Sequence, residues 1–369
     1  MGADSELHDA VTALCRDVNG IDWDAASVQA DVHRMLAAVK RASQAALDAA
    51  LATIVERLRI SQLSDADGVA QVAISGGTLV EYGAAPRPLA EVMLSKLPAV
   101  LDAARHYADT CLADLPALDE DDEEEEPEGI AHVDERAIPR DVFRSHLETD
   151  RGGGCALVGL RNWALPAIAA LTRDREMLRR ACADAELRAR ANALRDSDAH
   201  WLPVLLGAEL DTRWLALVPG EARGFHIRVD GIVSNFDLHT LVAAALIERG
   251  VAGKAPPKSL VAFLEGRAKD AAVSHIEGVW NYYDWRAAGY DLTRSVPTER
   301  WVWNEGVPSD VPKFQDMRTL LIGPPPLQRT WNVGRTFSAL AARVSVEEEL
   351  PAERVRELLT AMKQEAKRG

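Results

Sequence analysis

One set of imidazole and carboxylate side chains in this sequence could do acid–base chemistry: His226, Asp237, His239, His275 and Glu277. An imidazole beside a carboxylate is a common arrangement for a general base and the group that orients it. Two His with an acid can also hold a metal ion. His275 and Glu277 are two residues apart, so a strand would place both side chains on one face. A hydrolase site in the C-terminal part of the chain is therefore one hypothesis.

The same residues also have structural explanations. Ser234 and Asp237 have the spacing of a capping box, in which a Ser and an acid three residues later satisfy the start of a helix. His239 lies three residues before Val242, at the border of an apolar helix face where a hydrogen-bonded core His is common. The spaced motifs of zinc enzymes do not occur in the sequence. We therefore expect no metal and no cofactor.

A second candidate for catalysis is Cys155, which follows Gly152 to Gly154 at the predicted start of an apolar helix. A helix N-terminus lowers the pKa of a thiol and favours anions, and glycines let a ligand approach the backbone closely. The alternative is a flexible segment followed by a small core residue.

The segment from Gly323 to Arg335 is a candidate for binding. A short apolar strand ends there, three prolines follow, and Trp331 lies between Arg329 and Arg335. The segment lacks the Gly-Lys-Ser/Thr ending of a P-loop. It predicts a rigid loop whose Arg side chains bind a carboxylate or a phosphate, or else a structural crossover whose Trp covers a sheet edge.

Aromatic residues cluster nearby. In a strand from 280 to 285, alternation places Tyr283 and Trp285 on one face, and Trp301 and Trp303 would share a face of another strand. One face must be core. Trp and Tyr on the other would form a partner or ligand surface, and the alternative is that they too pack in the interior.

These residues need elements to position them, and the expected fold class is α+β, a mainly helical N-terminal unit followed by a mixed α/β Trp-rich unit. Apolar residues recur at helical spacing through residues 1–118. Residues 69–74 fit either a buried helix or a strand, and a strand ended by the glycine pair would form a small hairpin near 69–82. Residues 119–137 predict a disordered acidic linker. Residues 138–369 predict a helical pair (138–196) packed on a mixed α/β domain (200–369), since seven of the nine Trp lie between 201 and 331.

Within these parts the periodicity predicts individual elements. Helices are expected over 27–58, either with a break near 41–43 or as one long helix, and over 89–115, 139–147, 155–171, 173–195, 236–249, 259–269 and 351–367. Strands are expected over 214–218, 225–229, 273–285, 301–303, 319–322 and 344–346.

Charge and composition narrow the function classes. The net charge is −15, and the ten residues from 119 to 128 hold nine acids and no base, which leaves −6 for the rest of the chain. Nucleic-acid binding needs clustered positive charge, so it is not expected; the acidic run itself is a spacer or a docking tail for a basic partner. The Arg-rich stretch 173–195 is interleaved with acids, which is typical of a solvated, ion-paired face.

The sequence also predicts where in the cell the protein is located. No CxxC pair, membrane-length apolar run or basic leader is present, so the cytoplasm is expected, and the Arg and Ala usage suggests a bacterial source.

The leading hypothesis is a non-enzymatic interaction or assembly protein. It would bind a protein partner through its helical unit, and the product of a neighbouring gene is a candidate for that partner. It would bind a second partner or ligand through Trp-rich loops, and homo-oligomers are compatible with it. A hydrolase is the alternative, and a nucleic-acid mimic or binder is a weaker one.

Overall fold

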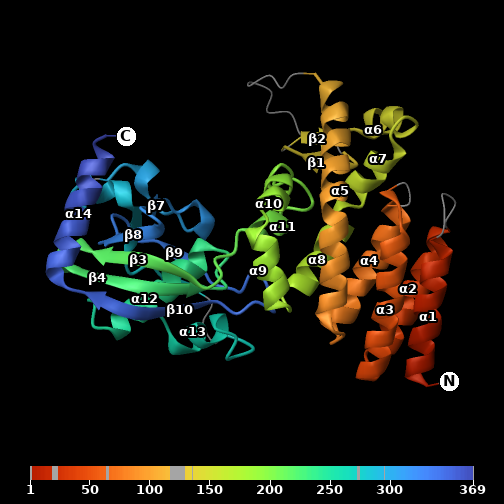
Figure 1. Cartoon of the computed structure of the whole chain (residues 1–369), viewed down its shortest axis with the longest axis horizontal. Coiled ribbons are helices and arrows are strands. Elements are labelled where there is room, and N and C mark those ends of the chain that lie inside the picture. Colours follow the sequence, from red (N-terminus) through yellow and green to blue (C-terminus); the bar gives the residue numbers. More distant parts are fainter. Residues whose placement is uncertain are drawn as a thin grey trace. The chain divides into compact units, whose positions relative to one another are not determined.

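The computed structural model describes residues 2–18, 24–63, 66–116, 129–134, 136–271, 275–294 and 296–368, without the side chains of 66 and 67. The acidic run 119–128 lies outside the described residues. The chain is α+β, as predicted, and divides into two compact units, Met1–Leu206 and Gly207–Gly369 (Figure 1). The helices between 140 and 206 group with the N-terminal helices, whereas the sequence placed their main part with the C-terminal domain.

The described part of the first unit consists of helices and one two-stranded ribbon. In chain order its elements are α1 (Ala3–Asp17), α2 (Ala25–Val39), α3 (Gln44–Ile60), α4 (Ala66–Glu81), α5 (Pro86–Ala113), β1 (Ala131–Val133), β2 (Arg136–Ile138), α6 (Arg140–Leu147), α7 (Arg151–Val158), α8 (Leu160–Leu171), α9 (Arg175–Ala183), α10 (Ala185–Asn192) and α11 (Trp201–Leu206). The predicted break near 41–43 is confirmed, because Ser43 caps α3 by accepting a hydrogen bond from the Ala46 amide.

The hairpin expected near 69–82 is wrong, because α4 runs through these residues. Gly76 and Gly77 do not end an element; they lie inside the helix where it meets its neighbours. A Cβ on Gly77 would lie 2.9 Å from the Cα of Pro166 in α8, and one on Gly76 would lie 3.0 Å from Ile54 in α3. The glycine pair therefore serves close helix packing at a cost in helix propensity.

Two helices that the sequence predicted as continuous are each divided. The expected helix 155–171 consists of α7 and α8, which meet at Gly159 with a bend of 55°. The expected helix 173–195 consists of α9 and α10, and the Asp184 carboxylate caps α10 by accepting from the Glu186 and Leu187 amides. In the described ranges no single helix is long and apolar enough to cross a membrane; the bent pair of α7 and α8 meets that test by length and composition alone.

The second unit is built around a twisted sheet with the strand order β10-β4-β3-β8-β6, in which β3 and β8 are parallel and the other neighbours are antiparallel. A separate ladder pairs β5 with β9. The elements are β3 (Thr212–Val218), β4 (Arg223–Asp230), α12 (Asn235–Glu248), α13 (Lys258–Leu264), β5 (His275–Glu277), β6 (Asn281–Asp284), β7 (Lys313–Phe314), β8 (Met317–Gly323), β9 (Thr330–Asn332), β10 (Arg343–Leu350) and α14 (Ala352–Ala366), with short 3-10 helices η2 (Pro219–Glu221), η3 (Trp285–Gly289), η4 (Thr298–Arg300) and η5 (Pro308–Asp310).

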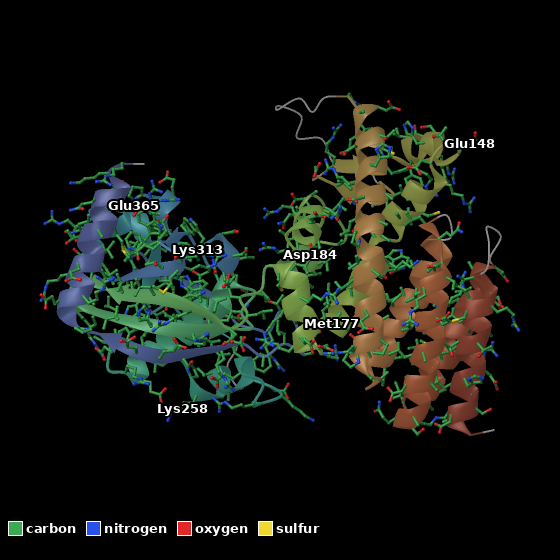
Figure 2. The ribbon with its side chains drawn as sticks, in the orientation of Figure 1. Glu148, Met177, Asp184, Lys258, Lys313 and Glu365 are labelled. Atoms are coloured by element: carbon green, nitrogen blue, oxygen red, sulfur yellow. The ribbon has the colours of Figure 1, made fainter. Side chains whose placement is uncertain are left out.

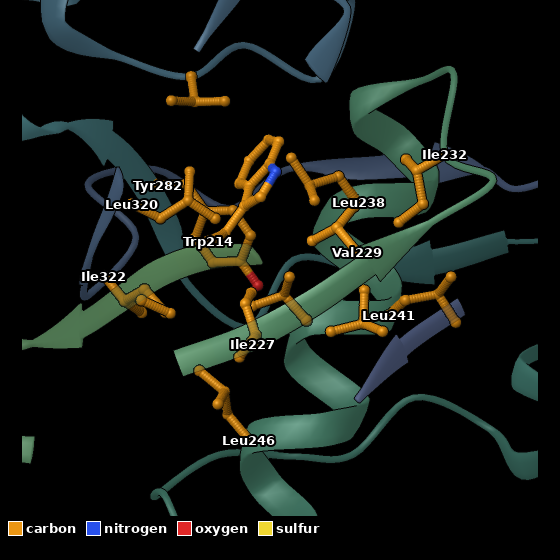
Figure 3. Packing of buried hydrophobic residues seen from close by; sticks show 14 of the residues in the cluster. Trp214, Ile227, Val229, Ile232, Leu238, Leu241, Leu246, Tyr282, Leu320 and Ile322 are labelled. Carbon is orange, nitrogen blue, oxygen red and sulfur yellow. The ribbon is translucent and has the colours of Figure 1, made fainter. Parts of the chain in front are cut away.

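Side chains of the central strands alternate between two apolar clusters, one on each face of the sheet. Trp214, Ile227 and Tyr282 pack with Leu238 and other α12 residues on one face (Figure 3). On the other face, the next residues along the strands pack against α14 and η3: Leu215, Leu217, Leu321 and Tyr283 with Val355, Leu358 and Met362. Both faces of the sheet are buried. Successive side chains along a central strand therefore point into one apolar core or the other, not alternately into core and solvent.

Most predicted elements of this unit are confirmed within a few residues, namely β3, β4, α12, β8, β10 and α14. Two are not. The strand expected over 273–285 is β5 and β6, separated by Gly278 to Trp280, and 272–274 lie outside the described residues. Trp301 to Trp303 form no strand; Trp301 makes a single bridge to Tyr283, because η4 ends directly before it.

Candidate functional site

The predicted His and acid set does not assemble into one site. His239 lies in the interior of the second unit, on α12. Its ring stacks on Tyr282 with centroids 4.1 Å apart, and its Nε2 lies 3.0 Å from the Val302 carbonyl oxygen. Burial lowers the pKa of His239 to about 3. This is a neutral structural imidazole, as the alternative explanation predicted.

His226 lies elsewhere, on β4. Its cross-strand neighbours are Leu215 and Glu348, so its side chain belongs to the sheet face covered by α14, whereas α12 covers the opposite face. Partial burial lowers the pKa of His226, and the positive charge of Arg213 adds to the effect. His226 and His239 are therefore on opposite sides of the sheet.

His275 and Glu277 do share one face, as their spacing predicted. They pair with Asn332 and Thr330 of β9, and both are exposed. His275 Nδ1 lies 3.3 Å from the Asn332 side-chain oxygen. Across the part of the chain that is described, no group of three or more His, Cys, Asp or Glu residues could hold a metal ion.

Asp237 is buried, and its environment is unusual for a carboxylate. Ser234 caps α12 through the Phe236 amide, so the predicted Ser cap is confirmed. Asp237 Oδ1 is buried with no hydrogen-bond partner. Burial raises the pKa of Asp237 to about 7. Asp237 is thus a buried acid whose pKa lies close to neutral pH. Burial causes this rise in pKa, and no His of the candidate set contributes to it.

Cys155 is a core residue of α7, well inside the helix and not at its N-terminus. The helix begins four residues earlier, and the Asp150 carboxylate caps it by accepting from the Gly153 amide at 2.8 Å. The glycines admit a neighbouring helix instead of a ligand: a Cβ on Gly153 would lie 2.9 Å from the Cβ of Tyr107 in α5, and one on Gly154 would lie 2.6 Å from Leu147. The thiol lacks the helix-terminal position that the catalytic hypothesis requires.

A cavity of about 680 Å³ lies along β5. Its lining comes from the β5–β9 ladder, with His275, Glu277 and Thr330, and from the loop 253–257. Apolar residues form much of the lining: Ile276, Val279, Pro256, Pro257 and Pro325. We call this cavity the β5 groove. The loop 253–257 was not predicted to be functional; its Pro256-Pro257 pair is the one signal that could have drawn attention to it.

The segment from Gly323 to Arg335 contributes to this groove, but only in part as predicted. Pro325 and Thr330 line it. Trp331 points the other way, is buried, and packs on Phe236 and His239 with centroids 6.3 and 6.1 Å apart. Arg335 lies over the Phe263 ring at 4.9 Å. Trp331 therefore packs into the interior from within β9, where neither a ligand loop nor the cover of a sheet edge had placed it.

Trp303 is the exposed residue of the aromatic region, and the mostly buried Arg329 packs against it. Trp303 is 41% exposed, its ring centre lies 5.0 Å from that of Trp301, and the Arg329 guanidinium lies 5.0 Å from the Trp303 ring. Glu305 holds Arg329 through Nη2 at 2.9 and 3.0 Å. These contacts give Trp303 a fixed orientation at the surface. We call Trp301, Trp303, Glu305 and Arg329 the Trp303 cluster.

Tyr283 and Trp285 do not form a binding surface on the outer face of a strand. Tyr283 is almost fully buried, and Trp285 packs on Phe314 with ring centres 5.4 Å apart. The prediction failed because α14 and η3 cover the face that was expected to be open. Comparison of the chain with protein-family models, with curated proteins and with solved structures gave no match.

Proposed function

We propose that this protein acts by binding, and that its C-terminal unit recognises an extended peptide segment of a protein partner in the β5 groove. The observation that carries the proposal is the pairing of β5. In the described residues β5 pairs with β9 alone, so its second edge is open, and this strand lines the groove. An exposed strand edge offers backbone donors and acceptors to an added strand.

The chemistry of the lining fits such an occupant. Proline and aliphatic side chains provide apolar contact, and Lys254, His275 and Glu277 provide polar contact at the sides. A groove of this volume accommodates a few side chains of a peptide. His275 is hydrogen-bonded to Asn332 and not to Glu277, so we assign both residues to peptide contact.

The Trp303 cluster supports the same proposal as a second anchor. Arg329 directly precedes Thr330 in the chain, and its carbonyl accepts a hydrogen bond from the Gly278 amide at 2.8 Å. Alternation places the Arg329 side chain on the face opposite Thr330. One segment therefore connects the groove with an exposed Trp303 that packs on a mostly buried Arg329, and Trp and Arg are enriched in protein–protein hot spots.

For the helical unit we propose a protein partner as well, in the cytoplasm, and the support is weaker. Among the described residues its exposed large apolar side chains come from different elements or the segments beside them: Leu36, Ile60, Tyr82, Ile130, Val158 and Trp201. Arg190, one of the basic residues of α10, is ion-paired with Asp102 and Glu186 inside this unit. That pairing supports the expectation that nucleic acid is not the partner.

The test is selection of peptides from a phage-displayed library of random linear peptides on the full chain. Selected peptides should bind the wild type, and Thr330→Trp, which fills the groove from its wall, should weaken them by at least about tenfold. The matched control is Lys313→Trp, at an exposed residue of β7 that does not line the groove. Equal binding to Thr330→Trp and wild type would refute the site.

The same peptides distinguish the hydrolase alternative. Mass spectrometry after incubation with the protein should find them intact. Cleavage that His275→Gln abolishes would replace the binding proposal with a catalytic one.

A further inference from the structure

A second cavity of the C-terminal unit, of about 540 Å³, is distinct from the β5 groove. It lies between η3, η4 and the C-terminal turns of α14, where Glu365 is labelled in Figure 2. Its charged lining consists of four cations and one acid: Arg286, Arg300, Lys363, Lys367 and Glu365. In a chain with a net charge of −15, this local excess of positive charge is opposite in sign to the protein as a whole.

Arg286 and Arg300 share one ion-pair partner, Asp284, but neither guanidinium makes a hydrogen bond to it. The Nη1 atoms of Arg286 and Arg300 each lie 3.9 Å from Asp284 Oδ2, which is too long for a hydrogen bond. Asp284 is buried, and its Oδ1 accepts from the Arg286 amide at 2.7 Å. The carboxylate thus holds two Arg side chains near one point while leaving their N–H donors available.

Arginines of the sheet behave differently. Arg223 and Arg228 each donate to a glutamate of β10 at 2.7 and 2.6 Å. Lys363 and Lys367 make no ion pair with any described residue. Cations near the C-terminus of a helix interact favourably with its dipole, which explains why two lysines lie at the end of α14. It does not explain Arg286 and Arg300, which come from η3 and η4.

Aromatic groups complete the lining. Tyr290 is exposed at the cavity, and Trp285 is buried with its Nε1 lacking a hydrogen-bond partner. The Arg286 guanidinium lies 5.6 Å from the Trp285 ring centre, which restricts its position. Asp291, the acid next to Tyr290, is engaged by Thr293 and Arg294. The cavity therefore presents converging cations beside an open phenol ring.

We infer that this cavity binds the phosphate group of a small phosphate ester. Arg side chains bind phosphate oxygens in a planar fork, and Lys adds point charge. A bare phosphate would leave most of this volume empty, so the organic part of the ester occupies the remainder beside Tyr290. The inference does not depend on peptide binding in the β5 groove.

The test is isothermal titration calorimetry of the full chain with AMP, ribose 5-phosphate and inorganic phosphate. AMP should bind more tightly than inorganic phosphate, and Arg286→Gln/Arg300→Gln should weaken AMP by at least about tenfold. Lys363→Gln/Lys367→Gln, at exposed helix positions that do not threaten folding, should weaken it as well. The matched control is Arg354→Gln/Arg356→Gln, which removes two cations from the other end of α14 and should leave AMP binding unchanged.

Each outcome of the titrations supports or overturns the inference. AMP binding more tightly than ribose 5-phosphate would support recognition of a ring beside Tyr290, and equal binding would support a sugar phosphate. Absence of binding of all three probes would overturn the inference. So would a control variant that weakens AMP as much as the Arg286/Arg300 variant, since overall charge and not a site would then be responsible. Inorganic phosphate binding as tightly as both esters would overturn the assignment to an ester.

Discussion

The ring of His239 stacks on Tyr282 at 4.1 Å, and the Tyr282 hydroxyl donates a hydrogen bond to the backbone carbonyl of the same His239. The imidazole in turn reaches the Val302 carbonyl, which can only accept, so Nε2 carries the proton. A helix, a sheet strand and a loop are therefore joined through one neutral imidazole. Protonating it would place a charge in the interior, which gives His239 a defined effect on stability against pH.

His239 should make the protein less stable in acid. In the folded state its pKa is about 3, whereas the unfolded chain has a His pKa of about 6.5. Below about pH 6.5 unfolding takes up a proton, so the free energy of unfolding falls by about 1.4 kcal/mol per pH unit as the pH drops. Urea titrations of wild type and Asp237→Asn measure this, because Asp237 otherwise masks it.

Asp237 has the opposite effect. Its folded pKa of about 7 lies above the unfolded value of about 3.9. Between these values unfolding releases a proton, so its contribution to stability is fully present in acid and is lost as the pH rises towards 7. Between about pH 4 and 6.5 the two contributions cancel in the wild type. Asp237→Asn should lose stability on acidification and His239→Gln should gain it; slopes equal to that of the wild type would contradict both assignments.

Gly154→Ala should destabilise the helical unit. The new Cβ would lie 2.6 Å from Leu147 Cδ1 and 3.2 Å from the Tyr107 ring, and overpacking of this kind costs about 1–3 kcal/mol. Gly152→Ala is the matched control. The nearest atoms there are 3.8 Å away, so the better helix former should be neutral or stabilising by up to about 1 kcal/mol. Thermal unfolding of both variants distinguishes packing from ligand access as the purpose of these glycines.

Glu209→Ala should destabilise the C-terminal unit by about 3–5 kcal/mol, because it leaves Arg318 largely buried without its partner. Arg318 Nε donates to Glu209 Oε1 at 2.7 Å, and the Thr212 hydroxyl donates to Oε2 at 2.7 Å. Glu209→Leu/Arg318→Met removes both charges and should recover much of the loss. A double variant as unstable as the sum of its singles would show that the pair is not coupled.

The cysteines should differ in reactivity. Cys15, Cys111 and Cys155 are buried, and burial raises the pKa of Cys15 and Cys111 to about 11. Cys182 is partly exposed. In the native protein Cys182 should therefore react first with a thiol reagent, and the other three only on unfolding. Mass spectrometry after limited labelling identifies the site; early modification of Cys155 would revive its catalytic candidacy.

Local patterns predicted the elements whose causes are local. β3 is a continuous apolar run, β4 alternates over most of its length, a short connection joins them, and Ser234 caps α12 at the predicted position. The glycines failed as signals because their reason is a contact with distant residues: Gly77 meets Pro166, and Gly154 meets Tyr107. No local rule distinguishes a glycine that ends an element from one that admits a neighbour.

Predictions about the candidate sites were right where local spacing decides the outcome and wrong where distant parts of the chain decide it. His275 and Glu277 share a face because their spacing is sufficient to ensure it. The predicted exposure of Tyr283 and Trp285 depended on what covers the second sheet face, and α14 lies more than 65 residues further along the chain. The phosphate cavity combines Arg286 and Arg300 with lysines of α14, which only the tertiary fold brings together.

The strand order has a consequence for the time course of synthesis. β4 can pair with β3 as soon as both have been made, but its other neighbour, β10, begins at Arg343, and β3 acquires β8 only after Thr319. Contacts of such long separation form slowly. The helices of the first unit can fold before the ribosome has synthesised the later strands of the sheet. A nascent β3–β4 hairpin therefore carries two unpaired edges during translation, and unpaired edges of this kind can pair with strands of other chains.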